Sequence, residues 1–234
     1  MINLHHIDCM EFMRGLPDKC YDLAIVDPPY GIGIVQQLEK TVASSSSMMN
    51  GCKGITGGHW DNEVPDAEYF KELMRVSENQ IIWGGNYFLD SLNATRCFCV
   101  WDKMNGTNPM ADAELAWTSF DGSVRMFRMH HFSKGYDPKI HPTQKPVALY
   151  RWLLQNYAKP GQRILDTHLG SGSIAIACDI EGFALVGCEI DADYIKAARH
   201  RLAVHQSAPR LFEATPAGLP QQLSLGDDVL SDGT

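Results

Sequence analysis

Asp27, Pro28, Pro29 and Tyr30 place an acid, two rigid prolines and an aromatic ring directly after a strand-like run at 21–26. This combination suits the clamping of a flat ring that carries an amino group. The lone pair of an exocyclic amine is delocalised into its ring, so the amine attacks poorly until hydrogen-bond acceptors localise that lone pair. We expect Asp27 and the Pro28 carbonyl to accept the two amino hydrogens, while Tyr30 stacks on the ring. The predicted chemistry is methylation of a base amine by a methyl sulfonium.

The same four residues also have a plainer interpretation as a stiff turn. Proline fixes φ and ends a strand ladder, so Pro28 and Pro29 would produce such a turn without any catalytic role. The other motifs of the chain therefore have to decide between a clamp and a turn.

A second motif, at 166–173, follows one predicted strand and opens a predicted helix. Gly170 and Gly172 let a ligand approach the backbone closely, and the helix N-terminus favours an anionic group. Glu189 ends the next predicted strand, where a carboxylate can accept hydrogen bonds from two ribose hydroxyls. A site for NAD or FAD is the alternative, but Ala175 makes the glycine fingerprint incomplete. The aspartate that leads the motif favours a ligand with an ammonium group, such as S-adenosylmethionine.

A third motif, His-Pro-Thr-Gln-Lys-Pro at 141–146, precedes another predicted helix. Lys145 is suited to pair with a cofactor carboxylate, and Thr143 to donate a hydrogen bond to the same group. Taken alone, the motif is equally typical of a polar loop that caps the helix beginning at Pro146.

Together and in this order, the three motifs resemble the β class of DNA amino-methyltransferases, the family of N6-adenine and N4-cytosine enzymes. The resemblance covers residues 1 to about 205. It implies S-adenosylmethionine as cofactor, double-stranded DNA as substrate, and often a homodimer. The catalytic residues that it implies are Asp27, Pro28, Pro29 and Tyr30. The cofactor-binding residues that it implies are Asp8, Thr143, Lys145, Asp166, Gly170, Ser171, Gly172, Glu189 and Ile190.

Within that family, an aspartate at position 27 favours adenine N6 and a serine favours cytosine N4, so adenine N6 is the predicted target. Cytosine N4 remains one alternative, and a nucleotide-binding module without catalysis is another, although a sensor would not need the Asp27 clamp. The chain departs from the family at Thr167 and His168, where Pro-Phe is frequent. His168 either alters the packing around the transferred methyl group or is a surface or hydrogen-bonded histidine without a role.

The charge distribution bears on DNA binding. The net charge is −8, which opposes contact with phosphates, but basic residues gather between 125 and 151. They form either a DNA-contacting surface or an ordinary solvated face. Loops at 31–62 and 121–140 are the predicted target-recognition segments. The candidate DNA-binding side chains are Lys103, Arg125, Arg128 and Lys134.

Composition limits the remaining classes. Seven cysteines are scattered without the spacing of a zinc site, so no metal is expected and a reducing cytoplasm is predicted. The resemblance implies a bacterial or phage-encoded protein. No apolar run approaches the roughly eighteen residues that a membrane span needs. The first residues lack the basic and apolar regions of a signal peptide.

Strands that alternate with helices predict an α/β fold. With the resemblance, the expected architecture is a circularly permuted Rossmann-like methyltransferase fold, whose sheet is mostly parallel with an antiparallel strand and has helices on both faces. We expect one domain over 1–205 and a flexible tail over 206–234. The segments 114–117 and 123–127 are predicted to pair as an antiparallel hairpin joined at 121–122.

Overall fold

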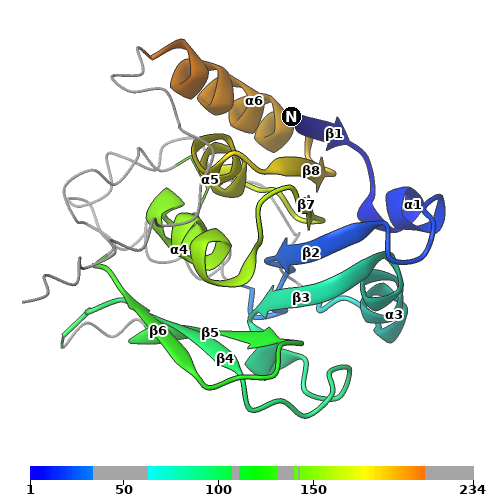
Figure 1. The fold of residues 1–234 in the computed structure, drawn as a ribbon, viewed down its shortest axis with the longest axis vertical. Helices are drawn as coiled ribbons and strands as arrows, with labels where there is room; N and C mark the ends of the chain where they lie inside the picture. The colour runs from blue at the N-terminus through cyan, green and yellow to red at the C-terminus, as the bar shows by residue number, and fades with distance from the viewer. Residues whose placement is uncertain (34–62, 107–110, 131–139, 142, 209–234) are drawn as a thin grey trace, which may run out of the picture.

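The computed structural model describes residues 1–33, 63–106, 111–130, 140–141 and 143–208 of the 234-residue chain. These residues form one sheet with helices on both faces (Figure 1). The strands are β1 (Ile2–His6), β2 (Tyr21–Val26), β3 (Ser77–Trp83), β4 (Phe98–Asp102), β5 (Ala113–Thr118), β6 (Arg125–Arg128), β7 (Arg163–Asp166) and β8 (Ala184–Glu189). The helices are α1 (Cys9–Arg14), α3 (Ala67–Val76), η1 (Gly85–Tyr87, a 3-10 turn), α4 (Val147–Tyr157), α5 (Ser173–Glu181) and α6 (Ala192–Ser207).

The sheet is mostly parallel. Its strand order is β1-β8-β7-β2-β3-β5-β4-β6, which Figure 1 shows from β1 at one end to the β4–β6 pair at the other. Every described pair is parallel except β3 with β5 and β5 with β4, so β5 alone runs against the other described strands. The predicted fold class, including its antiparallel strand, is confirmed.

One predicted pairing is wrong. β5 and β6 do not form a hairpin, because β4 lies between them and β6 pairs with β4 in parallel. The apolar end of β5, Ala116 and Trp117, is buried against β3 in the core. β6 carries the more exposed Arg125 and Arg128 and therefore suits the edge of the sheet. Local alternation of apolar residues cannot reveal which strands pair, since the pairing depends on which strand is buried in the core.

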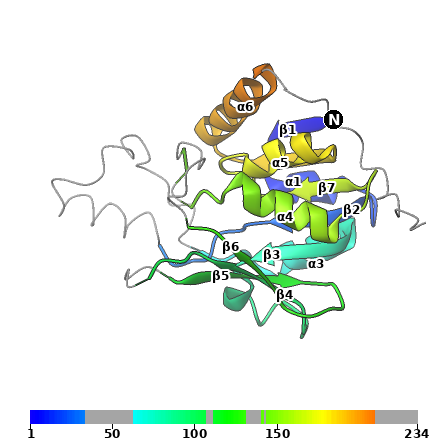
Figure 2. The same cartoon turned by 60° about the vertical axis from the view of Figure 1, so that its left-hand side comes forward.

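The two faces of the sheet are covered by different helices. Leu23 and Ile25 of β2 face the side that packs against α4, α5 and α6. Ala24 and Val26, the alternate residues, face the side that packs against α1 and α3. Figure 2 shows α4, α5 and α6 grouped over one face. The central strands are thus buried on both sides, as a parallel sheet requires.

Most predicted elements agree with the structure. The helix predicted to begin at Pro146 is α4, with Pro146 at its N-cap. Most of the predicted loop at 31–62 and of the predicted tail lies outside the described residues, which exclude 34–62 and 209–234.

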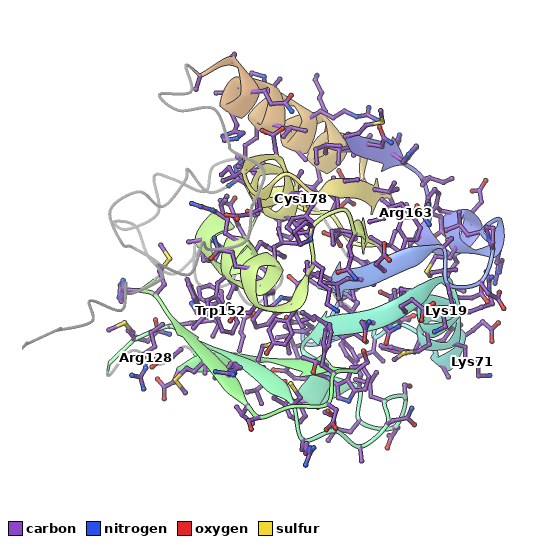
Figure 3. All side chains as sticks on the ribbon, viewed as in Figure 1. Lys19, Lys71, Arg128, Trp152, Arg163 and Cys178 are labelled. Carbon is purple, nitrogen blue, oxygen red and sulfur yellow. The ribbon has the colours of Figure 1, made fainter. Side chains whose placement is uncertain are left out.

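Helix α4 holds the segment before it against the sheet. Leu149 and Leu153 are one helical turn apart and fully buried against the strands. Trp152 packs its ring on Phe127 of β6, with centroids 5.8 Å apart (Figure 3). Lys145 precedes the helix by two residues, so the packing of α4 also determines where that side chain enters the protein.

The cysteines of the described part are all free thiols, and Cys97 and Cys99 are among the buried ones. Among the same residues, no cluster of three or more histidine, cysteine or acidic side chains is arranged to hold a metal ion. Of the described helices, none combines the length and the apolar character needed to cross a bilayer.

Replacing Leu153 with alanine should lower the free energy of unfolding by about 2–5 kcal/mol, because it leaves a cavity between α4 and the sheet. Urea denaturation followed by circular dichroism measures this change. Val204→Ala is the control, since Val204 lies on α6 and is 55% exposed. Equal losses in the two variants would contradict the placement of α4 against the core.

Candidate active site

One cavity of about 540 Å³ lies where four neighbouring strands end. Asp8 follows β1, Asp27 follows β2, Thr167 follows β7 and Ile190 follows β8, and all four line this cavity. These strands are adjacent and parallel, so their carboxyl ends meet at one edge of the sheet. In open α/β sheets such an edge is the usual location of a ligand site.

The cavity brings together residues that the sequence analysis selected from separate motifs. The predicted site residues that line it are Asp8, Asp27, Pro29, Thr143, Lys145, Gly170, Ser171, Glu189 and Ile190. Four predicted site residues do not line it: Pro28, Tyr30, Asp166 and Gly172. Each of them is the direct sequence neighbour of a lining residue. The acid of the first motif and the glycine turn of the second thus share one cavity.

Both carboxylate oxygens of Asp27 have protein partners. The Tyr30 hydroxyl donates to Oδ1 at 2.7 Å, and the Lys145 ammonium donates to Oδ2 at 2.5 Å. The Tyr30 ring stacks on the ring of Tyr87 at 5.0 Å between centroids. Gly84 has φ +71°, and a Cβ there would lie 2.2 Å from the Tyr30 ring, so a glycine is needed to admit it. Neighbouring side chains thus hold Asp27 and Tyr30 in place, and the role of these residues as a clamp for a base stays a prediction.

Lys145 is the central cation of the site. Its side chain is 1% exposed and lies between Asp27 and Glu114, whose Oε2 is 3.0 Å from its Nζ. The ammonium also lies over the Trp83 ring, 5.3 Å from the centroid. Sequence reasoning assigned Lys145 to a cofactor carboxylate, and that role stays a prediction. In the structure described here, its ammonium binds two protein carboxylates.

The charges in this group depend on one another. Burial raises the pKa of Asp27, and the attraction of Lys145 offsets only part of that rise. Burial opposes the charge of Lys145, but Asp27 and Glu114 outweigh it, so the pKa of Lys145 lies above its ordinary value. Burial likewise opposes ionisation of Glu114, yet Lys145 and Lys103 lower its pKa to about 2. Lys145 therefore stays charged, and Glu114 remains a carboxylate.

The glycine turn and the end of β8 support each other. The Gly170 amide donates to Glu189 Oε2 at 2.8 Å, and the Asp191 amide donates to Oε1 at 2.9 Å. These bonds fix the carboxylate plane and leave each oxygen a further lone pair for a ligand hydroxyl. Ile190, the next residue, lines the cavity with a side chain that is 65% exposed. An apolar surface so presented is suited to pack on a flat ring.

Asp166 lies behind the glycine turn. Its side chain is 2% exposed, and Oδ1 accepts a hydrogen bond from the His168 amide at 3.0 Å. Burial, followed by the charges of Asp27 and Glu189, raises its pKa to about 8, although the His168 amide and Lys145 oppose the rise. A cationic group beside Asp166 would favour its ionised form. The acid thus fits a ligand that carries an ammonium group.

His168 is a hydrogen-bonded histidine at the cavity wall and not a surface residue. Its Nδ1 is 3.0 Å from the Thr167 hydroxyl and 3.4 Å from the Tyr69 hydroxyl. Cys9 Sγ is 4.0 Å from Nε2. Burial lowers the pKa of His168 to about 4, so its ring is neutral near pH 7. Where the family often has Pro-Phe, this chain places a polar but uncharged ring.

The candidate DNA-binding side chains differ in their exposure and in their ion pairs. Arg128 is 68% exposed at the outer edge of the sheet (Figure 3), 3.2 Å from Asp102. Arg125 is exposed on the same strand. Lys103 is 17% exposed and pairs with Glu114 at 2.6 Å, so its charge is largely used inside the protein. Lys134 lies outside the described residues, and the DNA-binding role of all four stays a prediction.

Sequence reasoning missed several residues of the site. Glu114 was taken only as part of a strand, although an acid within an otherwise apolar buried strand is itself a signal of a buried ion pair. His141 and Tyr194 line the cavity with their rings 4.4 Å apart between centroids. Tyr150 lines it from α4. No local pattern marks the two tyrosines, because only the packing of α4 and α6 brings them to the cavity.

Comparison with known families agrees with the site. Residues 100–200 match the family described as DNA methylase, the N6/N4 methyltransferase family. This segment contains the 141–146 motif, the glycine turn and Glu189, while Asp27 precedes it. Over this segment the chain is similar to the N6/N4 DNA methylase family.

The chain also resembles individual proteins along most of its length. It is 22% identical to the type II methyltransferase M.HpaI of Haemophilus parainfluenzae over 83% of this chain and 72% of that protein. Its fold is similar to that of M1.HpyAVI, solved in complex with SAM, with a TM-score of 0.57, 19% identity, and coverage of 86% and 99% of the two chains. It also resembles the PvuII DNA methyltransferase, which is cytosine-N4-specific, with a TM-score of 0.54, 11% identity, and coverage of 91% and 88%.

Replacing Gly172 with alanine should destabilise the protein more than the same change at Gly182, although both glycines flank α5 with positive φ. Each variant pays about 1–2 kcal/mol for a left-handed residue with a Cβ. Only the Cβ at 172 also lies 2.9 Å from the Ala198 Cβ, whereas nothing lies within 4 Å at 182. Thermal unfolding measures the difference.

Ala198→Gly provides a rescue for this test. In a double-mutant cycle it should recover about 1 kcal/mol or more in the Gly172→Ala background relative to its own cost in the wild type. Purely additive effects would contradict the close packing of the glycine turn on α6.

Proposed function

We propose that this chain transfers a methyl group from S-adenosylmethionine to adenine N6 in double-stranded DNA. The observation that carries the proposal is the shared cavity, in which Asp27 and Pro29 lie together with Gly170 and Glu189. A clamp for an amino-bearing base and a site for a nucleoside cofactor are useful side by side only when a group passes between them.

The residues present fit S-adenosylmethionine. Glu189 is fixed by two backbone amides and has lone pairs left for ribose hydroxyls. Ile190 offers an exposed apolar side chain to the adenine ring. The buried Asp166, with a pKa raised to about 8, is suited to the ammonium of the methionine part. Asp8 and Thr143 line the same cavity and complete the proposed cofactor set.

When bound, the cofactor supplies an electrophilic methyl group on a sulfonium. The target base leaves the stack to reach Asp27, at a cost of a few kcal/mol. Asp27 then accepts one amino hydrogen through Oδ1, the oxygen that the Tyr30 hydroxyl occupies here. The Pro28 carbonyl would accept the other hydrogen. The amine nitrogen would bond to the methyl carbon as the methyl–sulfur bond breaks and leaves a neutral thioether, and the amine would lose one proton to Asp27 or water, without a covalent enzyme intermediate. Positioning and fixed charges supply most of the rate.

The choice of adenine rests on Asp27, since the resemblance associates aspartate at this position with adenine N6. Cytosine N4 is the second candidate target, and the cavity as described fits either amine. The proposed partner is double-stranded DNA, contacted in part by the exposed Arg125 and Arg128. By the same resemblance, we propose a homodimer in the cytoplasm, and we propose that any restriction nuclease is a separate chain.

Expression in a host without adenine methylation should produce N6-methyladenine in the host DNA, detected by mass spectrometry of digested nucleosides. Asp27→Ala should remove the signal, because the clamp is lost. N4-methylcytosine would retain the reaction and overturn the target base. Absence of both modified bases, with a folded protein that binds S-adenosylmethionine, would contradict DNA methylation and favour a non-catalytic module.

Glu189→Gln should weaken S-adenosylmethionine binding about ten-fold or more, because hydrogen bonds from ribose to a charged acceptor contribute about 1.5–3 kcal/mol. Isothermal titration calorimetry measures the dissociation constant. Asp27→Asn, a change of the same kind on the base side of the cavity, should leave that constant nearly unaltered. Equal losses in both variants would argue against separate cofactor and base sides.

A further inference from the structure

Glu114 connects the proposed catalytic acid to the rest of the sheet. It lies on β5, the strand that runs against the others, and its side chain is 20% exposed. Oε1 is 2.6 Å from Lys103 Nζ and Oε2 is 3.0 Å from Lys145 Nζ. The carboxylate therefore bridges two lysines, one of which holds Asp27. Asp27, Lys145, Glu114 and Lys103 form a row of alternating charges whose sum is zero.

The geometry of Lys145 explains why one acid is not enough. An ammonium has three hydrogens to donate. Its nitrogen lies 2.5 Å from Asp27 Oδ2, 3.2 Å from the Tyr30 hydroxyl and 3.0 Å from Glu114 Oε2. Two of these hydrogens thus have acceptors on Asp27 and Tyr30, and Glu114 adds a second negative charge at ion-pair distance. The site is 1% exposed, so water cannot replace a missing partner. Without Glu114, the ammonium would have to turn towards Asp27 with a second hydrogen.

We propose that Glu114 is a positioning residue for methyl transfer: it holds Lys145 on Oδ2 of Asp27, so that Oδ1 is left for the amino group of the target base. This inference rests on the proposed function. In this structure the Tyr30 hydroxyl donates to Oδ1, and it thereby marks the position that the amino group of the base would take. A lysine with Asp27 as its single acid would compete with the base for both oxygens.

The charge of Glu114 also acts on Asp27. Burial raises the pKa of Asp27, Lys145 lowers it, and Glu114 raises it again. The carboxylate of Glu114 thus keeps Asp27 a stronger hydrogen-bond acceptor than a single lysine partner would allow. The other titratable groups that interact with Asp27 are Tyr30, Tyr69, Tyr150 and Asp166, and Lys103 lies beyond Glu114.

A purely structural role is the competing explanation. In that case Glu114 would only neutralise a buried lysine, and its loss would reduce stability without altering the chemistry of Asp27. The pH dependence of the rate separates the two roles, because a stability defect lowers the amount of folded enzyme and does not move the ionisation of Asp27.

The test is Glu114→Gln, which keeps the shape of the side chain and an oxygen that can accept from Lys145. Its kcat should fall by up to about a hundred-fold, as a slightly misplaced reacting group can cause. The dissociation constant for S-adenosylmethionine should not change. The acid limb of the kcat profile should move to lower pH, because the loss of a negative charge lowers the pKa of Asp27. An unchanged kcat would overturn the proposal.

Two controls separate this effect from general damage. Glu181→Gln breaks another ion pair of a partly buried glutamate, whose Oε1 is 2.6 Å from Arg151 Nε on α4, and should leave the pH profile in place. Lys145→Met should move the acid limb in the opposite direction, to higher pH, because it removes the cation that favours ionised Asp27. Shifts of the same sign in Glu114→Gln and Lys145→Met would contradict the charge row.

A measurement without turnover keeps the inference separate from the proposed function. Carboxyl ¹³C NMR titration of the ligand-free protein reports Asp27 directly, with its signal assigned by Asp27→Asn and so distinguished from Asp166. Glu114→Gln should lower the midpoint of that signal, and an unmoved midpoint would overturn the inference. If the wild type methylates no DNA, the proposed function fails, and this midpoint still decides whether Glu114 controls the Asp27 carboxylate.

Discussion

The buried ammonium of Lys145 is the interaction on which the site depends. It joins the end of β2, the middle of the sheet at β5 and the segment before α4, which are far apart in the sequence. A lysine with 1% exposure is tolerated only because Asp27 and the Tyr30 hydroxyl accept its hydrogen bonds and a second carboxylate, Glu114, lies at ion-pair distance. The same contacts explain how Asp27 can sit in the interior and still serve as an acceptor.

The direction of the strands explains why the other groups converge. β1, β8, β7 and β2 are adjacent and parallel, so the residues that follow them meet at one edge although their order in the chain is different. The glycine turn after β7 and Glu189 after β8 are then tied by a backbone hydrogen bond. A cofactor site and a base clamp become neighbours without any loop having to span the sheet.

Burial and neighbouring charges give the acids of the site different pKa values and therefore different roles. Glu114 lies between two lysines and has a pKa of about 2, whereas no cation among the described residues forms an ion pair with Asp166, whose pKa rises to about 8. The first acid therefore carries a permanent charge that can orient Lys145. The second gains most from a cationic ligand. Identical functional groups differ here because their neighbours differ, which is the general basis of pKa tuning.

The sequence by itself determined the fold class, nearly all of the helices and strands, and the motifs that line the cavity, because turns, caps and apolar periodicity are local properties. It did not reveal that β4 separates β5 from β6, nor that Lys145 binds Asp27 and Glu114. Only the tertiary structure decided these points, since strand partners and buried ion pairs depend on which distant segments share the core. An acid in an apolar strand was a local signal of a buried ion pair at Glu114, but the two lysines that pair with it are near it only in the folded protein.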